Sequence, residues 1–311
     1  MSFIAGAAAT NVDLLFENLP RMPEPGEEIY TGSMSLQLGG GLPGTLVNLG
    51  RLGVPVRIGT ELGSDLFSRF AAEEFARAGA EVVNLGDLSC AGPTDGAGPA
   101  PIPVNITAAV ILPHDRSFIS YGKGGLTRNG RTENGFYSMA RGAKICLMDA
   151  GGFVGAYKKL KDDGAVMVLD MGWDDELSFE KYSELFALAD YYTPNRKEAL
   201  KLTGKNDPRE ALLELKKRFG HPLVKLDAEG CIGIDEQGEF FEPSFDEFKN
   251  VDSTGAGDAF LAGLCYGLYH GRSFRECVRL GNITGGKAVT AVGALSAYCT
   301  EEELLRLNGR S

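Results

Sequence analysis

The fold of this chain is decided by one stretch, Val251-Asp252-Ser253-Thr254-Gly255-Ala256-Gly257-Asp258-Ala259-Phe260. Its small residues lead into an apolar run that continues to Leu268, which predicts a tight loop followed by a largely buried helix. The first N–H groups of a helix lack intrahelical partners, and the helix dipole adds positive potential there. Because Gly255, Ala256 and Gly257 carry almost no side chain, we expect these N–H groups to form an anion site.

Asp258 is predicted to lie inside the first turn of this helix, beside the bound anion. A carboxylate next to a phosphate is repulsive, so it indicates a chemical task, the simplest being to accept a proton from an attacking hydroxyl. The helix dipole is expected to keep the pKa of Asp258 low. The alternative is an ordinary capped helix, with Asp252 or Ser253 as N-cap and glycines that only permit a sharp turn.

The whole stretch resembles the D-T-x-G-A-G-D-x-F signature of the ribokinase-like (PfkB) carbohydrate kinases. The resemblance implies that Gly255, Ala256 and Gly257 form the anion hole for the transferring phosphoryl group and that Asp258 is the catalytic base. It also implies ATP as the phosphoryl donor and Mg²⁺ as its counter-ion. The signal is independent of the Walker loop, G-x-x-x-x-G-K-[ST], which does not occur in this sequence.

The composition excludes several classes of function. The chain has 311 residues, a net charge of −11 and 43% hydrophobic residues, enough for a large α/β core. Phosphate backbones need clustered Lys and Arg, so a nucleic-acid surface is not expected. Six cysteines without a C-x-x-C pair indicate reduced thiols and a cytoplasmic location. We expect neither a signal peptide nor a membrane span.

The chain alternates between helices and strands from residue 131 onward, which is typical of a parallel sheet covered by helices. Two extended segments, near 10–38 and 99–121, fall outside this alternation, and the Gly- and Pro-rich segment 86–101 is expected to be a mobile loop. Other strands are expected near 2–7, 54–59, 81–85, 145–149, 165–170, 190–193 and 222–226, with a hairpin near 232–242.

The resemblance implies that the two extended segments form a small β-strand lid over the sugar site. We therefore predict an α/β fold of the ribokinase-like type, with a central, mainly parallel sheet flanked by helices. Residues 1–311 are expected to form a single domain that includes the lid. Exposed lid edges also suggest a homodimer, because unpaired strand edges attract partners.

A second glycine-rich stretch, Gly39-Gly40-Gly41-Leu42-Pro43-Gly44, has three interpretations. It fits G-x-G-x-x-G with Glu61 as the ribose-binding acid, which would indicate an NAD-dependent oxidoreductase. It also resembles the family's G-G-x-x-x-N-x-A motif, followed at the right distance by R-L-G at residues 51–53. A purely structural turn is the third possibility.

The family motif implies that a sugar approaches the backbone of Gly40 and Gly41. The Asn of that motif, which commonly bonds substrate hydroxyls, falls on Gly44 here. We therefore expect ribose to be a poor acceptor and the space at Gly44 to admit a bulkier one. Asp13 lies in Asn11-Val12-Asp13, which resembles the family's N-x-D. The resemblance implies that Asp13 binds two sugar hydroxyls, and the alternative is a solvated carboxylate at a strand end.

Thr193-Pro194-Asn195-Arg196-Lys197-Glu198 resembles the family's P-N-x-x-E motif. The resemblance implies that Asn195 and Glu198 orient waters bound to Mg²⁺. An Asn N-cap with a capping-box Glu has the same spacing and remains open.

The segment around Leu223–Gly230 resembles the family's ATP-receiving V-T-x-G-x-x-G, with Lys225 in place of Thr and Asp227 in place of the first Gly. Lys225 either contacts a nucleotide phosphate or only balances the charge of Asp227. Gly230 remains as in the family, and Asn282 occupies a position that borders adenine in relatives.

Two further positions follow from the resemblance. Asp252 and Gly293 match a turn that holds a monovalent cation such as K⁺ in many relatives. Arg116 follows the predicted hairpin, where it could contact a substrate anion. The sequence thus predicts an ATP-dependent kinase acting on a hydroxymethyl group of a sugar or sugar-like alcohol. A nucleoside or sugar-phosphate kinase is the nearest alternative, and a non-catalytic nucleotide-binding regulator is a more distant one.

Overall fold

The computed structural model describes residues 2–86, 102–112, 116–245 and 247–309. Its centre is a six-stranded sheet in which all neighbouring strands run parallel. In order across the sheet the strands are β10 (Tyr191–Tyr192), β9 (Val166–Asp170), β8 (Ile145–Asp149), β1 (Ile4–Ala7), β4 (Val56–Thr60) and β5 (Ala80–Asn84). The predicted α/β fold with a central parallel sheet is confirmed.

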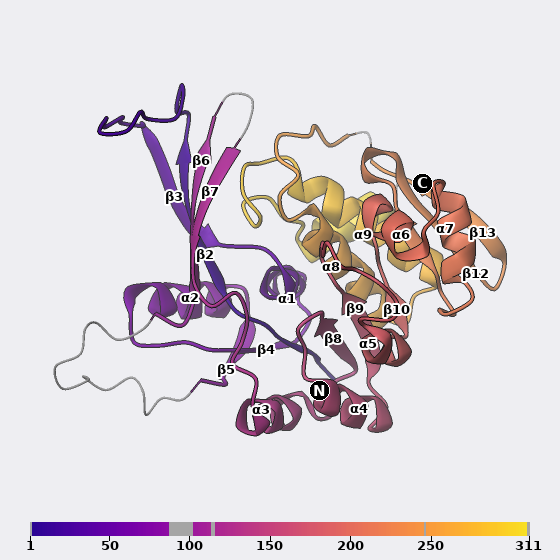
Figure 1. The fold of residues 1–311 in the computed structure, drawn as a ribbon. Helices are drawn as coiled ribbons and strands as arrows, with labels where there is room; N and C mark the ends of the chain where they lie inside the picture. The colour runs from indigo at the N-terminus through magenta and orange to yellow at the C-terminus, as the bar shows by residue number, and fades with distance from the viewer. Residues whose placement is uncertain (1, 87–101, 113–115, 246, 310–311) are drawn as a thin grey trace.

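Strand β8 shows why this sheet is covered on both faces. Ile145 and Leu147 pack into one apolar core, and Cys146 and Met148 pack into the other. Successive side chains of a strand point to opposite faces, so a continuous apolar run buries both of them. Helices must therefore lie on both sides, as Figure 1 shows.

The helices divide between the two cores. On one face lie α1 (Leu42–Arg51), α2 (Leu66–Arg77), α8 (Ala256–Tyr269), α9 (Phe274–Ala288) and α10 (Glu301–Asn308). On the other lie α3 (Gly130–Ala140), α4 (Val154–Asp162), α5 (Ser183–Leu188), α6 (Arg196–Thr203) and α7 (Pro208–Leu215). Within the described part of the chain, no helix has both the length and the apolar character needed to cross a membrane.

The two extended segments predicted near 10–38 and 99–121 meet in one four-stranded sheet, which we call the outer sheet (Figure 1). Its order is β3 (Ser33–Leu38), β2 (Asn11–Glu17), β6 (Asn105–Ile111) and β7 (Arg116–Tyr121). Strands β2 and β6 are parallel, and the outer pairs are antiparallel. Apart from Gly86, the loop expected at 86–101 lies outside the described residues.

A third sheet is antiparallel and comprises β11 (Leu223–Lys225), β12 (Gly230–Asp235) and β13 (Gly238–Pro243). The sequence had placed 222–226 in the parallel alternation. In the structure a single parallel bridge, between Asn195 and Lys225, links this sheet to the central one.

Candidate active site

The loop before α8 has the backbone expected of an anion site. Gly255 is the N-cap of α8 with φ 78°, and a Cβ added there would lie 2.4 Å from the carbonyl oxygen of Ala294. Only glycine fits this position. No side chain caps the helix, so the predicted N-cap role of Asp252 or Ser253 is wrong. The N–H of Ala256 contacts the Ser253 carbonyl at 3.3 Å, and the following first-turn N–H groups have no side-chain acceptor.

Asp258 lies in the first turn of α8 and contacts the second glycine-rich stretch. Its Oδ2 accepts a hydrogen bond of 2.7 Å from the N–H of Gly41. Burial, and then the negative charge of Asp170, raise the pKa of Asp258 to about 7, against the opposing effects of the Gly41 N–H and Lys225. The expectation of a low pKa was wrong, because desolvation outweighs the helix dipole.

Asp13 lies on the other side of the same glycine stretch. A Cβ added at Gly39 would be 2.9 Å from both carboxylate oxygens of Asp13, and one added at Gly40 would be 2.5 Å from Asp258 Oδ2. Burial raises the pKa of Asp13 to about 6. The two carboxylates therefore both pack closely against a backbone segment that carries no side chains.

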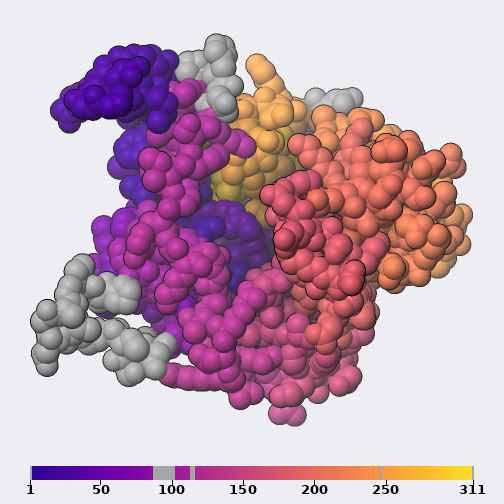
Figure 2. Space-filling view, in the orientation of Figure 1, coloured from indigo at the N-terminus to yellow at the C-terminus, as the bar shows by residue number. Residues whose placement is uncertain are grey.

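Gly44 faces the same space. A Cβ there would lie 3.4 Å from the carbonyl oxygen of Gly39 and 3.5 Å from Asp258 Oδ2, which are ordinary contact distances. The structure thus brings together Asp13, Gly40, Gly41, Gly44 and Asp258, which are up to 245 positions apart in the sequence. In the space-filling view, a recess separates the indigo and magenta N-terminal segments from the orange segment (Figure 2).

The dinucleotide interpretation of this glycine stretch is wrong. The stretch leaves β3, a strand of the outer sheet, whereas a dinucleotide fold needs a strand of the parallel sheet at this place. The N–H of Gly41 is bonded to Asp258 and so does not point to a pyrophosphate. Glu61 is buried, and its Oε1 accepts from the N–H of Thr127 at 3.2 Å.

Lys225 projects toward the start of α8. Its Nζ lies 3.7 Å from the position of a Cβ added at Gly257, and its charge lowers the pKa of both Asp258 and Glu198. Asp227 has a left-handed backbone, φ 56°, which explains the glycine of the family motif at this position. Its carboxylate lies 3.8 Å from Arg196, not beside Lys225. Lys225 therefore lies close to the first turn of α8.

Gly230 and Asn282 hold the third sheet in place. A Cβ at Gly230, whose φ is 118°, would lie 2.2 Å from the carbonyl oxygen of Glu242. The amide of Asn282 donates to the carbonyl oxygens of Glu242 and Pro243 at 2.9 and 3.0 Å, and its Oδ1 accepts from Cys231 Sγ at 3.2 Å. Nucleotide contacts at these two residues stay predictions.

Asn195 and Glu198 form the capping box that the sequence left open. Asn195 Oδ1 accepts from the N–H of Glu198 at 3.0 Å, and Glu198 Oε2 accepts from the N–H of Asn195 at 2.9 Å. Burial raises the pKa of Glu198, and its hydrogen bonds with Asn195 and the charge of Lys225 oppose this rise. The cap occupies one oxygen of Glu198, so a role toward Mg²⁺ is compatible with it and stays a prediction.

Asp252 and Gly293 are bonded directly to each other. Asp252 Oδ2 accepts from the N–H of Gly293 at 2.9 Å, and Oδ1 accepts from the N–H and hydroxyl of Thr254 at 3.0 and 2.8 Å. Arg116, from the outer sheet, forms an ion pair with Oδ1. Burial would raise the pKa of Asp252, but these donors and the Arg116 charge together hold it below its usual value.

Asp170 is a site residue that the sequence reasoning missed. It ends β9 at the carboxyl edge of the central sheet, and its charge raises the pKa of Asp258 and Glu198. Ligands of open parallel sheets bind at this edge. An acidic residue directly after the buried run Val166–Leu169 was the available signal.

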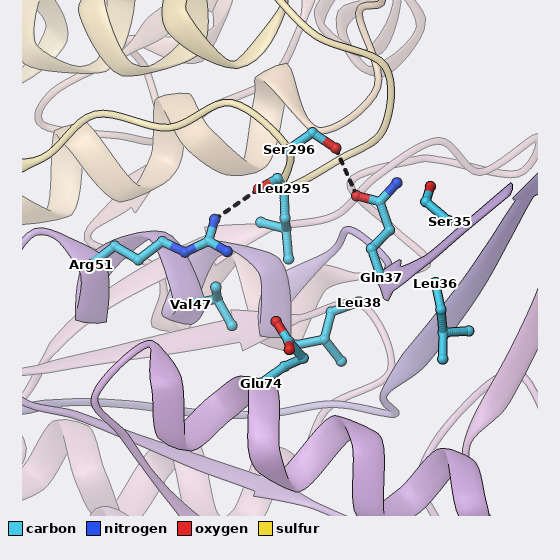
Figure 3. Close-up of a pocket in the computed structure, with 9 residues that line it drawn as sticks. All are labelled: Ser35, Leu36, Gln37, Leu38, Val47, Arg51, Glu74, Leu295 and Ser296. Atoms are coloured by element: carbon cyan, nitrogen blue, oxygen red, sulfur yellow. Dashed lines mark hydrogen bonds between the residues drawn. The ribbon is translucent and has the colours of Figure 1, made fainter. Parts of the chain in front are cut away.

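A separate cavity of about 220 Å³ lies between the outer sheet, α1 and α2 (Figure 3). Arg51 Nη1 donates to the Leu295 carbonyl oxygen at 2.9 Å, and Ser296 Oγ contacts Gln37 Oε1 at 3.0 Å across it. Leu295 also contacts the Gly44 position from this side. None of the predicted site residues lines this cavity.

The sequence comparisons point to carbohydrate kinases. Residues 156–301 match the family described as pfkB family carbohydrate kinase. A 2-dehydro-3-deoxygluconokinase of Bacillus subtilis (strain 168) is 32% identical over 135 residues, 42% of this chain and 41% of that protein. A fructokinase of Escherichia coli is 30% identical over 170 residues, 52% of this chain and 53% of that protein. The chain thus spans about half or less of the length of these curated relatives.

Solved structures share the fold over the entire chain. The ribokinase of Arabidopsis thaliana complexed with ribose and ATP superposes with a TM-score of 0.80 at 22% identity, covering 100% of both chains. A protein described as ribokinase II of Escherichia coli, in complex with ATP and Mg²⁺, gives a TM-score of 0.79 at 20% identity, again with 100% of both chains. The resemblance to the ribokinase-like (PfkB) kinases is confirmed.

Proposed function

We propose that this chain, which carries a pfkB family carbohydrate kinase domain and the ribokinase fold, is an ATP-dependent kinase acting on a hydroxymethyl group of a sugar or sugar-like alcohol. The observation that carries the proposal is the position of Asp258. It lies in the first turn of an uncapped helix, 2.7 Å from the backbone of a glycine stretch whose other side faces Asp13. A base is thus held between an anion site and a polar acceptor space.

The phosphoryl side would work by electrostatics. The first-turn N–H groups around Gly255, Ala256 and Gly257 stabilise negative charge on the transferring group, and the ammonium of Lys225 adds a positive charge beside them. Gly230 and Asn282 keep the third sheet beside this position, and Asp227 gives its turn the required backbone. Asp258 then accepts the hydroxyl proton. A pKa of about 7 suits a general base at neutral pH.

The site fits Mg²⁺ held mainly through water and nucleotide phosphates. Over the described residues, no three or more His, Cys, Asp or Glu side chains are grouped so that they could hold a metal directly. The Tyr192 hydroxyl is buried without a hydrogen-bond partner, and the charge of Glu198 helps to raise its pKa, which fits bound water near these two residues. Asn195 and Glu198 would orient that water. The ion would neutralise phosphate charge during transfer.

The acceptor side is formed by Asp13, the backbone of Gly40 and Gly41, and the space at Gly44. A carboxylate can accept hydrogen bonds from two neighbouring hydroxyls, which fits a sugar. The outer sheet would act as a lid, because it carries Asp13 on β2 and closes one side of the recess. Closure would exclude water and suppress ATP hydrolysis.

The decisive experiment is a screen for acceptor-dependent ADP release from MgATP. It should include ketoses and keto-deoxy sugar acids, because relatives are named for such substrates, together with pentoses, sugar phosphates and nucleosides. A nucleoside or sugar-phosphate acceptor would leave the phosphoryl-transfer site as described and correct only the acceptor class. No acceptor-dependent release, combined with tight nucleotide binding, would favour the non-catalytic regulator.

We further propose a homodimer through the outer sheet, in the cytoplasm. Strand β7 is an edge strand, and Phe118 and Ile119 on it are 55% and 70% exposed. Such an edge can pair with a second copy. Five described cysteines are free and buried, which fits a reducing compartment. Sedimentation at micromolar concentration tests the dimer, and a monomer there would refute it.

A further inference from the structure

Asp252 places a negative charge beside the proposed anion hole. Its side chain is only 9% exposed, and it lies three residues before Gly255. An uncompensated carboxylate so close to the start of α8 would weaken the binding of a phosphate there, since screening by water is small at a buried position. Some positive charge must therefore neutralise Asp252.

The groups around Asp252 do not fit a bound monovalent cation. A cation needs oxygen atoms directed toward it, such as backbone carbonyls. Gly293, expected from the resemblance to help hold K⁺, instead presents its N–H to Asp252 Oδ2 at 2.9 Å. Thr254 directs its N–H and hydroxyl to Oδ1, and the guanidinium of Arg116 pairs with the same oxygen. All these contacts are donors, and among them the guanidinium of Arg116 supplies the positive charge.

We propose that Arg116 is a built-in replacement for a monovalent cation: its guanidinium neutralises Asp252 beside the anion hole and makes phosphate binding there independent of K⁺. The proposal deepens the proposed function and rests on it for the identity of the anion. Arg116 is a positioning residue, because it acts on the hole through Asp252.

This arrangement also ties the charge to the outer sheet. Arg116 is the first residue of β7, whereas Asp252 belongs to the loop before α8, 136 positions further along the chain. The anion hole would thus reach its full positive potential only while the outer sheet lies against this loop. A dissolved cation could not provide such coupling.

The test compares Arg116→Ala, Arg116→Lys and the double variant Arg116→Ala/Asp252→Asn with the wild type. Arg21→Ala is the matched control, because Arg21 also lies between strands of the outer sheet and pairs with an exposed carboxylate, that of Glu27. Each protein is studied in tetramethylammonium chloride and in potassium chloride at equal ionic strength. The readouts are melting temperature and ADP affinity by calorimetry, followed by kcat/KM once an acceptor is known.

For the wild type and for Arg21→Ala, the ADP affinity and the melting temperature should differ only slightly, and by the same amount, between the two salts. Arg116→Ala should bind ADP about tenfold or more weakly in tetramethylammonium chloride, because an unpaired buried charge remains, and K⁺ should restore much of the loss. Arg116→Lys should stay close to the wild type. The double variant should recover affinity without responding to K⁺, since neither charge is left.

Two results would overturn the proposal: a wild type whose ADP affinity and stability require K⁺, or an Arg116→Ala variant whose response to K⁺ equals that of Arg21→Ala. If Arg116→Ala fails to fold in both salts, the double variant decides. A double variant that folds and does not respond to K⁺ supports the proposal that Arg116 neutralises Asp252, and one that does not fold refutes it. The melting temperature does not depend on catalysis. The proposed role of Arg116 can therefore be refuted while the proposed kinase activity holds. Equally, the kinase activity can be refuted while the role of Arg116 holds.

Discussion

The two sides of the recess are built in different ways. The phosphoryl side comes almost entirely from one contiguous loop and helix start, with Lys225 beside it, and lies inside the region that matches the kinase family. The acceptor side is assembled from Asp13 on β2 and the stretch Gly39–Gly44, and lies outside that region. In the proposed function, the reaction type would thus be encoded locally, whereas the choice of acceptor would depend on contacts between distant segments.

Asp258 is where the two sides meet, so its replacement should have the largest effect. Asp258→Asn keeps the size of the side chain and can still accept from the Gly41 N–H, but removes the base. Turnover should fall by about 10²- to 10⁴-fold, while ADP binding and melting temperature change little. Because the rate needs the deprotonated carboxylate, wild-type kcat/KM should rise with pH through about 7, and this rise should vanish in the variant.

The matched control is Asp162→Asn, a change at an exposed carboxylate on α4. Turnover, nucleotide affinity and melting temperature are measured on one preparation of each protein. If the activity of Asp258→Asn stayed within a few-fold of the wild type, Asp258 would not be the base. The idea that the loop before α8 determines the reaction type would then lose its support.

Gly40→Ala should disturb the acceptor side next most strongly. The new Cβ would lie 2.5 Å from Asp258 Oδ2, so the base or the glycine stretch must shift. Such overpacking costs about 1–3 kcal/mol, which predicts a loss of roughly 5- to 150-fold in turnover. Gly32→Ala is the control, since a Cβ there meets nothing within 4 Å. Steady-state kinetics with the best acceptor would contradict the prediction if both variants were equally active.

Lys225→Met should affect only the phosphoryl side. Loss of a charge-assisted contact to phosphate should raise the KM for ATP about tenfold or more and leave the acceptor KM nearly unchanged. The positive charge of Lys225 lowers the pKa of Asp258, so the rise of kcat/KM with pH should move to higher pH. Lys197→Met, at an exposed position on α6, is the control. A pH profile identical to the wild type would place Lys225 away from the base.

Gly44→Asn should have the smallest effect and bear only on acceptor choice. The site leaves ordinary contact distances for a Cβ, so the amide can enter without displacing Asp258. One added hydrogen bond is worth about 0.5–1.5 kcal/mol, which predicts a gain of roughly 2- to 10-fold in kcat/KM for ribose relative to the wild-type acceptor. Competition between the two acceptors measures this ratio directly. Ribose as the best acceptor of the wild type would already refute the idea.

The sequence could predict the features that short segments determine. The uncapped glycine turn before Asp258 depends on ten consecutive residues. The continuous apolar run of β8 likewise indicates a strand that is buried on both faces. The capping box of Asn195 and Glu198 was visible in their spacing. The hairpin near 232–242 was predicted and is confirmed, whereas the antiparallel pairing of 223–225 with it was missed, because strand pairing is set by tertiary packing.

The electrostatics of the site could not be predicted in the same way. The pKa of Asp258 depends on its burial and on Asp170, 88 positions earlier, and neither follows from a local motif. The pairing of Arg116 with Asp252 likewise joins two sheets that the sequence does not place relative to each other. The resemblance suggested separate partners for these two residues, a substrate anion and a cation, whereas the structure makes them partners of each other.

The glycine stretch also has a mechanical role, because it joins β3 of the outer sheet to α1 of the main body. The Gly41 N–H is one of the two contacts that lower the pKa of Asp258. If the outer sheet moved away and water reached Asp258, the burial that raises its pKa would be lost together with this bond, and burial is the larger of the two effects. The raised pKa of Asp258 is thus a property of the closed arrangement, and we expect it to fall toward its usual value when the outer sheet moves away.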